Sequence, residues 1–294
     1  MKHVKVDHYD AFTRTAGKGN PAGVILKAQE YNTDEMQEIA RQIGFSECAF
    51  YLPSDKADFS LRYFTPGSEV NLCGHATIAS VYALYKDTPK DEAPVHKRVE
   101  TKAGIIDVSY HPADQEVVMS QADAQFLAFD GNREALAHSI GIQETDFETD
   151  LPIVYGSTGL WTVIIPIKSL EAFSRMKPNH TLFSSILKEM PNASVHPICM
   201  ETLKKETTLH GRHFSPEATG RIEDPITGTA CGVMGAYYIS YIQPLEQGCD
   251  ILIDQGQEAG YDGIVHVWAR KVGGAIKVKI AGTATKVAER SAHI

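Results

Sequence analysis

The chain has 294 residues, a formal net charge of −9 and 43% hydrophobic residues, which together predict about two packed domains. The acidic balance argues against nucleic acid or an anionic membrane surface as a partner, and no apolar stretch is long enough to span a bilayer. Met1–Asp7 reads as a strand and lacks the apolar run of a signal peptide, and the odd count of five cysteines includes no Cys-x-x-Cys pair. We therefore expect a cytoplasmic protein with reduced thiols.

The first half of the chain alternates strands and helices between turn residues. Val4–Tyr9 and Pro21–Leu26 read as strands. Thr33–Ile43 is predicted to be a helix that is capped by Thr33 or Asp34 and stopped by Gly44. The other predicted elements of this half are, in order, strands over Ser46–Leu52 and Arg62–Pro66, a helix over His75–Tyr85, a surface loop over Lys86–Lys97, and a hairpin of Arg98–Ser109 and Glu116–Ser120.

The second half repeats this order of elements. It opens with Gln125–Phe129, which we interpret as part of a linker. The predicted elements that follow are a strand over Thr162–Pro166, a largely helical segment over Leu170–Met190, strands over Ser194–Met200 and Arg212–Pro216, a helix over Val233–Ile242, and a run of strands with Gly-rich turns between Ile251 and Val287.

One motif occurs once in each half. Arg62-Tyr-Phe-Thr-Pro66 leads into Cys73-Gly-His75, and Arg212-His-Phe-Ser-Pro216 leads, after a longer loop, into Thr229-Ala-Cys231-Gly232. Each copy is a short aromatic strand followed by a Cys-Gly pair that opens a helix with apolar or small residues on nearly every side. A helix of that kind is enclosed by its own domain. The repeat therefore predicts a duplicated domain with a site between the copies.

Glu47 is the only acid in the apolar strand Ser46–Leu52. Burial disfavours a carboxylate and raises its pKa, which suits a group that both accepts and donates a proton near neutral pH. The plain alternative is a glutamate on an edge strand that points to water.

Two predicted helix N-termini contain polar residues that could bind a substrate. His75 follows Gly74 in a first helical turn, where the partial positive charge favours neutral imidazole. In the second half, Asp224 lies in a turn and Thr229 would make an ordinary N-cap. Free backbone N–H groups at Gly74 and His75 in one copy, and at Gly228, Thr229 and Ala230 in the other, would together bind a carboxylate. These helix starts therefore point to a small anionic substrate.

The remaining signals are weaker. Cys73 and Cys231 suggest two thiols acting on opposite faces of one carbon, or simply small buried residues at tight helix starts. Gly17–Gly23 lacks the spacing of a dinucleotide-binding loop. His210 and His213 flank Gly-Arg without further ligands nearby, so we expect no metal there.

Several motifs together resemble one family, the PhzF-like (phenazine biosynthesis) isomerases, which share the diaminopimelate epimerase fold. The motifs are Asp10-Ala-Phe-Thr13, Gly19-Asn-Pro21, Ser46-Glu47, Phe64-Thr-Pro66, Cys73-Gly-His-Ala-Thr77 and Glu223-Asp-Pro-Ile-Thr-Gly-Thr-Ala230. The resemblance covers nearly the whole chain.

The resemblance implies an α+β fold of two pseudo-symmetric domains, each a curved, mainly antiparallel sheet around a central helix. We place these domains at residues 1–121, joined by a last strand near 284–294, and at residues 122–283. The resemblance further implies a cofactor-free, metal-free site between the domains and is compatible with a homodimer.

The resemblance also assigns roles to residues. Glu47 would be the catalytic acid/base of a proton-shifting isomerase, with His75 and Asp224 beside it. Ser46, Cys73, Gly74, Gly228, Thr229 and Ala230 would bind the carboxylate substrate. Thr229 stands where the phenazine enzyme has serine, which keeps the hydroxyl.

Two other functions remain open at this point. The epimerase branch of the fold also has a catalytic cysteine at the position of Cys73, but it has asparagine where His75 stands. If Thr229 is aligned with that branch, Cys231 falls one residue short of the second catalytic cysteine, and one residue turns a helical side chain by about 100°. The third interpretation is a protein that binds a small acid without chemistry, which turnover of any carboxylate substrate would exclude.

Overall fold

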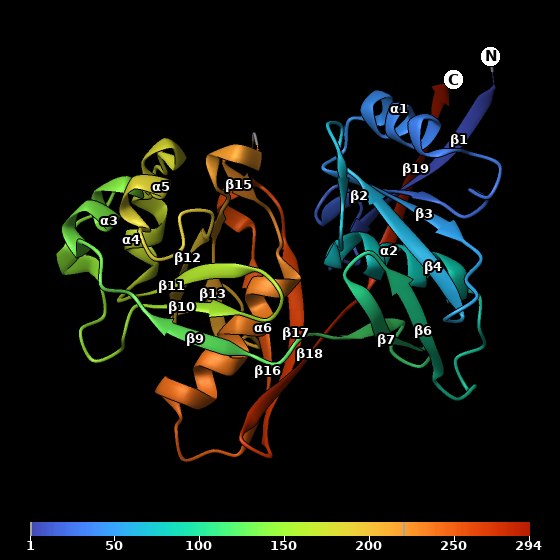
Figure 1. Ribbon diagram of the computed structural model, residues 1–294. Coiled ribbons are helices and arrows are strands. Elements are labelled where there is room, and N and C mark those ends of the chain that lie inside the picture. Colours follow the sequence, from blue (N-terminus) through green and yellow to red (C-terminus); the bar gives the residue numbers. More distant parts are fainter. Residues whose placement is uncertain (1, 220) are drawn as a thin grey trace. The chain divides into compact units, whose positions relative to one another are not determined.

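The computed structural model, which describes residues 2–219 and 221–294, divides the chain into two compact units (Figure 1). The first is Met1–Ser120 with Ala281–Ile294, and the second is Gln121–Ile280. The chain has a mixed α+β fold, as predicted. Within the described residues, no helix combines the length and apolar character that a bilayer crossing needs.

The first unit contains two helices and nine strands among its described residues. The helices are α1 (Thr33–Ile43) and α2 (Gly74–Tyr85), and the strands are β1 (His3–Ala11), β2 (Asn20–Ile25), β3 (Glu47–Leu52), β4 (Phe59–Phe64), β5 (Glu69–Val70), β6 (Val95–Thr101), β7 (Gly104–His111), β8 (Glu116–Ser120) and β19 (Ala284–His293). Strand β1 lies between β19 and β2, antiparallel to both, so the two chain ends lie side by side (Figure 1). Antiparallel pairs predominate, and β2 with β3 and β4 with β6 are parallel.

Helix α2 forms the centre of the first unit because most of its surface is apolar and buried. It contacts β1, β2, β3, β7, β8 and β19, so the sheet curls around it. Helix α1 packs on another part of the same sheet through Met36 and Ile39, which join a core that includes Phe50 and Phe64. Truncating one such buried aliphatic side chain to alanine typically costs about 2–5 kcal/mol of stability.

The second unit runs from Gln121 to Ile280. Its helices are α3 (Arg133–Ser139), α4 (Leu170–Arg175), α5 (Phe183–Ile186) and α6 (Gly228–Tyr237), and its strands are β9 (Gln125–Ala128), β10 (Val154–Ser157), β11 (Trp161–Ile167), β12 (Ser194–Cys199), β13 (Leu209–Gly211), β14 (His213–Phe214), β15 (Glu223–Asp224), β16 (Gly248–Gln255), β17 (Gly263–Val272) and most of β18 (Ala275–Gly282). Strand β11 is parallel to β12, as β2 is to β3. Helix α6 packs against β10, β16 and β17.

The repeated arginine has the same role in both units. Arg62 donates through Nε and Nη2 to the two carboxylate oxygens of Glu69, at 2.7 and 3.0 Å. Arg212 makes the same two-pronged contact with Glu223, at 2.9 and 2.8 Å. Arg62 lies in β4, whereas Arg212 lies between β13 and β14, so the predicted strand Arg212–Pro216 is reduced to the two residues of β14. In each case the pair ties the arginine to the short strand that leads to the central helix. The sequence repeat therefore corresponds to a repeated local structure.

Four expectations of local structure in the first unit and at the start of the second need correction. The predicted strand Arg98–Ser109 is divided between β6 and β7, which pair with each other antiparallel. The N-cap of α1 is Asn32, not Thr33 or Asp34, because its side chain accepts from Glu35 N while the Glu35 carboxylate accepts from Asn32 N. Val95 already belongs to β6, so the surface loop after α2 ends before Lys97. Residues 125–128 are not a linker but the strand β9, which pairs antiparallel with β10.

Two helical segments of the second unit also differ from expectation. Residues 170–190 form the short helices α4 and α5 with a 3₁₀ turn at His180–Leu182 between them, and Pro178 disfavours helical backbone at the residue before it. The central helix begins at Gly228, before the predicted Val233, and its last part, Tyr238–Ile242, widens into π-helical hydrogen bonding.

Candidate active site

In the first unit, a strand start and a helix start bring together residues that are distant in sequence. Glu47 opens β3 and lies opposite Ala22 in the parallel register with β2, which itself begins at Asn20. Cys73 and His75 lie at the N-terminus of α2, which packs on both strands. The topology thus places Glu47, Cys73, His75 and Asn20 at one end of the curled sheet.

These four side chains form a compact polar cluster. His75 Nε2 lies 3.3 Å from Glu47 Oε2. The Cys73 Sγ atom lies 3.4 Å from His75 Nδ1 and 3.8 Å from His75 Nε2. The amide nitrogen of Asn20 lies 3.3 Å from His75 Nδ1. The Asn20 amide therefore orients the imidazole ring so that Nε2 faces Glu47.

The cluster is shielded but not closed. Asn20, Cys73 and His75 are 0%, 7% and 8% exposed, while the Glu47 side chain is 21% exposed. In the described part of the chain, Glu47 Oε2 and Ser46 Oγ are buried atoms without a hydrogen-bond partner. Buried polar atoms are usually hydrogen-bonded in folded proteins, so these two adjacent atoms retain the capacity to accept or donate a further hydrogen bond.

The start of α2 adds backbone donors beside this cluster. Cys73 is the N-cap residue, and its side chain makes no capping hydrogen bond. The amides of the first turn, which include those of Gly74 and His75, therefore have no acceptor from the N-cap side chain, an arrangement that favours an anion.

The start of α6 is the corresponding place in the second unit. The N-cap residue is Thr227 and makes no side-chain cap, so Thr229 is not the N-cap that its sequence context suggests. The Thr227 hydroxyl instead donates to the Asp224 carboxylate. The amides of Gly228, Thr229 and Ala230 consequently lack a side-chain acceptor from the cap.

Gln255 holds the loop before α6 in place. It is 1% exposed, and its carbonyl oxygen accepts from Thr227 N at 3.3 Å and from Cys231 Sγ at 3.5 Å. Its amide nitrogen donates to the Asp224 carbonyl at 3.1 Å. One side chain thus fixes both the Asp224 backbone and the first turn of the helix.

Gln255→Leu is expected to lower the unfolding free energy of the second unit by about 1–3 kcal/mol, because buried partners lose their hydrogen bonds. Denaturant titration followed by tryptophan fluorescence measures this. The matched control is Gln257→Leu, because the Gln257 amide bonds Asp262 instead. Equal stability of the two variants would contradict the role given to Gln255.

Cys231 has different surroundings from Cys73. It is fully buried, and burial raises the pKa of its thiol far above the usual range, with a further contribution from Asp224 and Asp254. Its thiol donates to Gln255 Oε1 at 3.5 Å. A buried thiol of this kind is a poor proton acceptor, so the two helix starts do not offer two equivalent thiol bases.

Comparison with known proteins identifies the family. The family model of phenazine biosynthesis-like proteins, PhzC-PhzF, matches residues 9–290. The chain belongs to this family. It is 49% identical to the uncharacterized isomerase YfhB of Bacillus subtilis over 97% of both chains. It is 29% identical to the trans-2,3-dihydro-3-hydroxyanthranilate isomerase of Pseudomonas aeruginosa, over 97% of this chain and 98% of that one.

A solved structure supports the same assignment. The PhzF-family phenazine biosynthesis protein of Bacillus anthracis superimposes with a TM-score of 0.95 at 46% identity, covering 100% of each chain. The resemblance inferred from the sequence motifs is therefore confirmed, and the protein is an isomerase of the PhzF family.

Within this PhzF-family chain, the structure groups the predicted site residues by unit. The first unit brings together Glu47, His75 and Cys73, with Ser46 and Gly74 adjacent in sequence. The second unit groups Asp224 with the helix start at Gly228, Thr229 and Ala230.

Sequence reasoning gave no role to three residues of these groups. Asn20, Thr227 and Gln255 all make contacts that organise the candidates. Asn20 was part of the motif Gly19-Asn-Pro21, which could have marked it, whereas Gln255 carries no signal in its neighbourhood.

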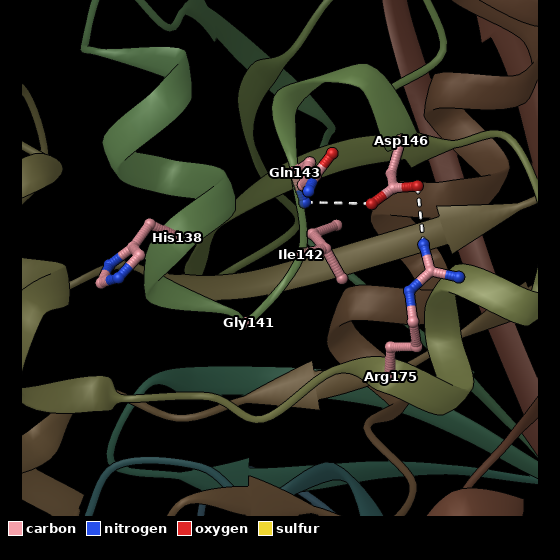
Figure 2. Close-up of a pocket in the computed structure, with 6 residues that line it drawn as sticks. All are labelled: His138, Gly141, Ile142, Gln143, Asp146 and Arg175. Carbon is pink, nitrogen blue, oxygen red and sulfur yellow. Dashed lines mark hydrogen bonds and ion pairs between the residues drawn. The ribbon is translucent and has the colours of Figure 1, made fainter.

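A separate cavity of about 460 Å³ lies at the outer helices of the second unit, as Figure 2 shows. It is lined by His138, Gly141, Ile142, Gln143, Asp146 and Arg175, none of which is a site candidate. Asp146 accepts from Arg175 at 2.8 Å and from the Gln143 backbone at 3.0 Å (Figure 2). Because Arg175 is paired with Asp146, its charge is already balanced and does not favour binding of an acidic substrate in this cavity.

One group of side chains has donor atoms placed for a metal ion. Glu47, Cys73 and His75 each present a donor atom within 4.8 Å of the other two. Among the residues that the structure describes, no other group of three His, Cys, Asp or Glu meets that criterion. His210 lies instead between two acids, 3.4 Å from Asp254 and 2.9 Å from Glu258.

Proposed function

We propose that this isomerase moves a proton within a small carboxylate-bearing substrate, without a cofactor, and that Glu47 is its general acid/base. The observation that carries the proposal is the state of the Glu47 carboxylate. It lies 3.3 Å from His75 Nε2, and its Oε2 atom is buried without a hydrogen-bond partner in the described chain. The Glu47 side chain is nevertheless 21% exposed, so its second carboxylate oxygen, which does not face His75, is available to a substrate C–H group.

The proposed reaction needs only proton transfers. The Glu47 carboxylate accepts a proton from one carbon, and the electron pair of that C–H bond delocalises into an adjacent unsaturated system. The same carboxyl group then returns the proton to a second carbon, where a new C–H bond forms. The substrate is isomerised, Glu47 is regenerated, and no electrons are exchanged with another molecule.

His75 has a positioning and electrostatic role in this scheme. Asn20 orients the imidazole ring so that Nε2 faces Glu47. An N–H at Nε2 stabilises the carboxylate form before proton abstraction and can hold a developing negative charge on the substrate.

The substrate anion is assigned to the helix starts. In the first unit these are the amides at Gly74 and His75, together with the unpartnered Ser46 hydroxyl. In the second unit we assign the same role to Gly228, Thr229 and Ala230, with Asp224 as a polar partner of the substrate. Backbone N–H groups at a helix start bind carboxylates without a cationic side chain.

The matched arginine pairs and strand orders support the duplication of one domain. We propose that Arg62–Tyr85 superimposes on Arg212–Ile242 and that both helix starts serve one substrate. An experimental structure with a bound small acid tests this, and an acid held by one unit alone would contradict it.

The substrate class follows from this chemistry and from the name of one relative. The Pseudomonas aeruginosa protein is named for its action on trans-2,3-dihydro-3-hydroxyanthranilate, so the first compounds to test are that acid and other small unsaturated or amino-bearing acids. The assay is deuterium incorporation from D₂O into substrate C–H positions, followed by NMR. Binding without exchange or isomerisation would favour a protein that holds small acids without chemistry.

Replacing the two cysteines distinguishes the Glu47 mechanism from the two-thiol epimerase mechanism. Cys73→Ala and Cys231→Ala, singly and together, are expected to keep most of the isomerase activity. The reason is that Cys73 contributes its backbone to the helix start and Cys231 is a buried thiol that bonds Gln255. Turnover and circular dichroism of the three variants measure this. Complete loss of turnover in a folded single variant would favour the epimerase mechanism.

A further inference from the structure

The donor atoms of Glu47, Cys73 and His75 have the chemistry and spacing of a tetrahedral zinc site. Zinc binds thiolate sulfur at about 2.3 Å and imidazole nitrogen or carboxylate oxygen at about 2.0 Å, so tetrahedral geometry separates S from N by about 3.5 Å and N from O by about 3.3 Å. The observed separations are 3.8 Å for Cys73 Sγ to His75 Nε2 and 3.3 Å for His75 Nε2 to Glu47 Oε2.

The charges of this cluster also suit a divalent cation. A thiolate and a carboxylate carry two negative charges, which balance Zn²⁺ in a shielded site where an unpaired charge would be costly. Soft sulfur together with imidazole favours zinc and similar thiophilic ions over Mg²⁺ or Ca²⁺, which prefer oxygen ligands.

The surroundings allow a cation to enter and to be held. The Glu47 side chain is 21% exposed and forms the open side of the cluster. Three protein ligands leave the fourth tetrahedral position for water. If the metal occupies Nε2, the ring proton moves to Nδ1, and a half-turn of the Asn20 amide, which already contacts that nitrogen, supplies an acceptor. An orienting partner of this kind is typical of a metal-bound histidine.

We propose that Glu47, Cys73 and His75 bind Zn²⁺ or a similar thiophilic divalent cation, which inhibits the isomerase. The inhibition rests on the function proposed above, because a Glu47 oxygen bonded to a metal cannot accept a substrate proton. The ion displaces protons from the donor groups and occupies the place of the reacting carbon. It acts as an inhibitor rather than as a cofactor.

The binding test uses Zn²⁺ alone, competed against a chromophoric chelator, on the full chain. One zinc per chain is expected, and Cys73→Ala and Glu47→Gln should each weaken binding at least about 100-fold, since even loss of an orienting partner costs about 10–100-fold. Cys231→Ala is the matched control, because its sulfur lies at the other helix start but contacts Gln255. It should bind zinc as the unaltered chain does.

A spectroscopic test identifies the sulfur ligand. Co²⁺ added in place of zinc should give a thiolate-to-metal charge-transfer absorption that Cys73→Ala lacks and Cys231→Ala retains. Zinc affinities that are equal in the unaltered chain and in all three variants would overturn the proposed site. Zinc bound at the cluster with undiminished turnover would contradict the proposed inhibition together with the catalytic role of Glu47.

Discussion

Glu47→Gln is expected to lower turnover by about 10⁴-fold or more. One positioned acid/base usually contributes about 10²–10⁴-fold, and a sole proton carrier lies at or beyond the upper end of that range. Glutamine keeps the size of the side chain and a hydrogen-bonding tip, but it cannot exchange a proton between two carbons. Substrate affinity should change by less than roughly tenfold, because the proposed carboxylate contacts come from helix starts rather than from Glu47. The measurement is turnover together with binding of the first acid that shows deuterium exchange.

The design of this experiment separates chemistry from folding. Glu92→Gln is the control, since Glu92 is an exposed glutamate of the same unit and lies outside the cluster. Circular dichroism checks that both variants fold. Near-normal turnover of folded Glu47→Gln would remove Glu47 from the mechanism, and a loss confined to substrate affinity would assign it to binding.

Much of the fold could be predicted because its signals are local. The bounds of α1 follow from helical periodicity and from Gly44, whose φ of 74° is a left-handed conformation that glycine adopts without strain. The central helices were recognisable because they are apolar on nearly every side. Residues 125–128 were misread as a linker because an exposed strand shows little alternation, and its pairing with β10 depends on residues far along the chain.

The candidate site could be predicted only where a residue stood out in its own segment. Glu47 did so as a lone acid in an apolar strand, and His75 as the residue after a helix-opening glycine. Asn20 reaches His75 across 55 positions of sequence, and Gln255 reaches Thr227 across 28. Contacts of that kind depend on how strands and helices pack, which no local pattern encodes.

The second unit also contains buried histidines that should make its stability depend strongly on pH. His196 and His213 face each other through their Nδ1 atoms at 3.1 Å. Burial, with a smaller effect of the neighbouring histidines, lowers the pKa of His196 well below its usual value. Burial lowers the pKa of His213 to about 4, although Asp224 opposes the shift. Both rings are therefore neutral in the folded protein over most of the acidic range.

His210 behaves in the opposite way. Burial opposes its charged form, but the ion pairs with Asp254 and Glu258 outweigh burial and raise the pKa of His210 to about 9. Its stabilising effect is fully present below the unfolded value near 6.5 and is lost as the pH rises through 9. Titration of His210 therefore lowers stability at alkaline pH, whereas titration of His196 and His213 lowers stability at acidic pH.

The unfolding free energy of the second unit is therefore expected to be highest near pH 6.5. As the pH falls from 6.5 to 4, His196 and His213 bind protons in the unfolded chain but not in the folded chain. The unfolding free energy therefore falls. A shift of this size at His213 alone is worth about 3 kcal/mol, at 1.36 kcal/mol per pKa unit, and His196 adds to it. The rise from 6.5 to 9 should cost a similar amount through His210.

The two tryptophans make this prediction measurable, because Trp161 and Trp268 both lie in the second unit. Denaturant unfolding followed by their fluorescence at a series of pH values reports the free energy of that unit. His213→Gln should reduce the slope of stability against pH between 6.5 and 4 by up to one proton, about 1.4 kcal/mol per pH unit. His138→Gln, at an exposed position of the same unit, should leave the slope unchanged. A flat profile of the unaltered protein from pH 4 to 6.5 would show that the His196–His213 pair binds protons in the folded state as readily as in the unfolded chain.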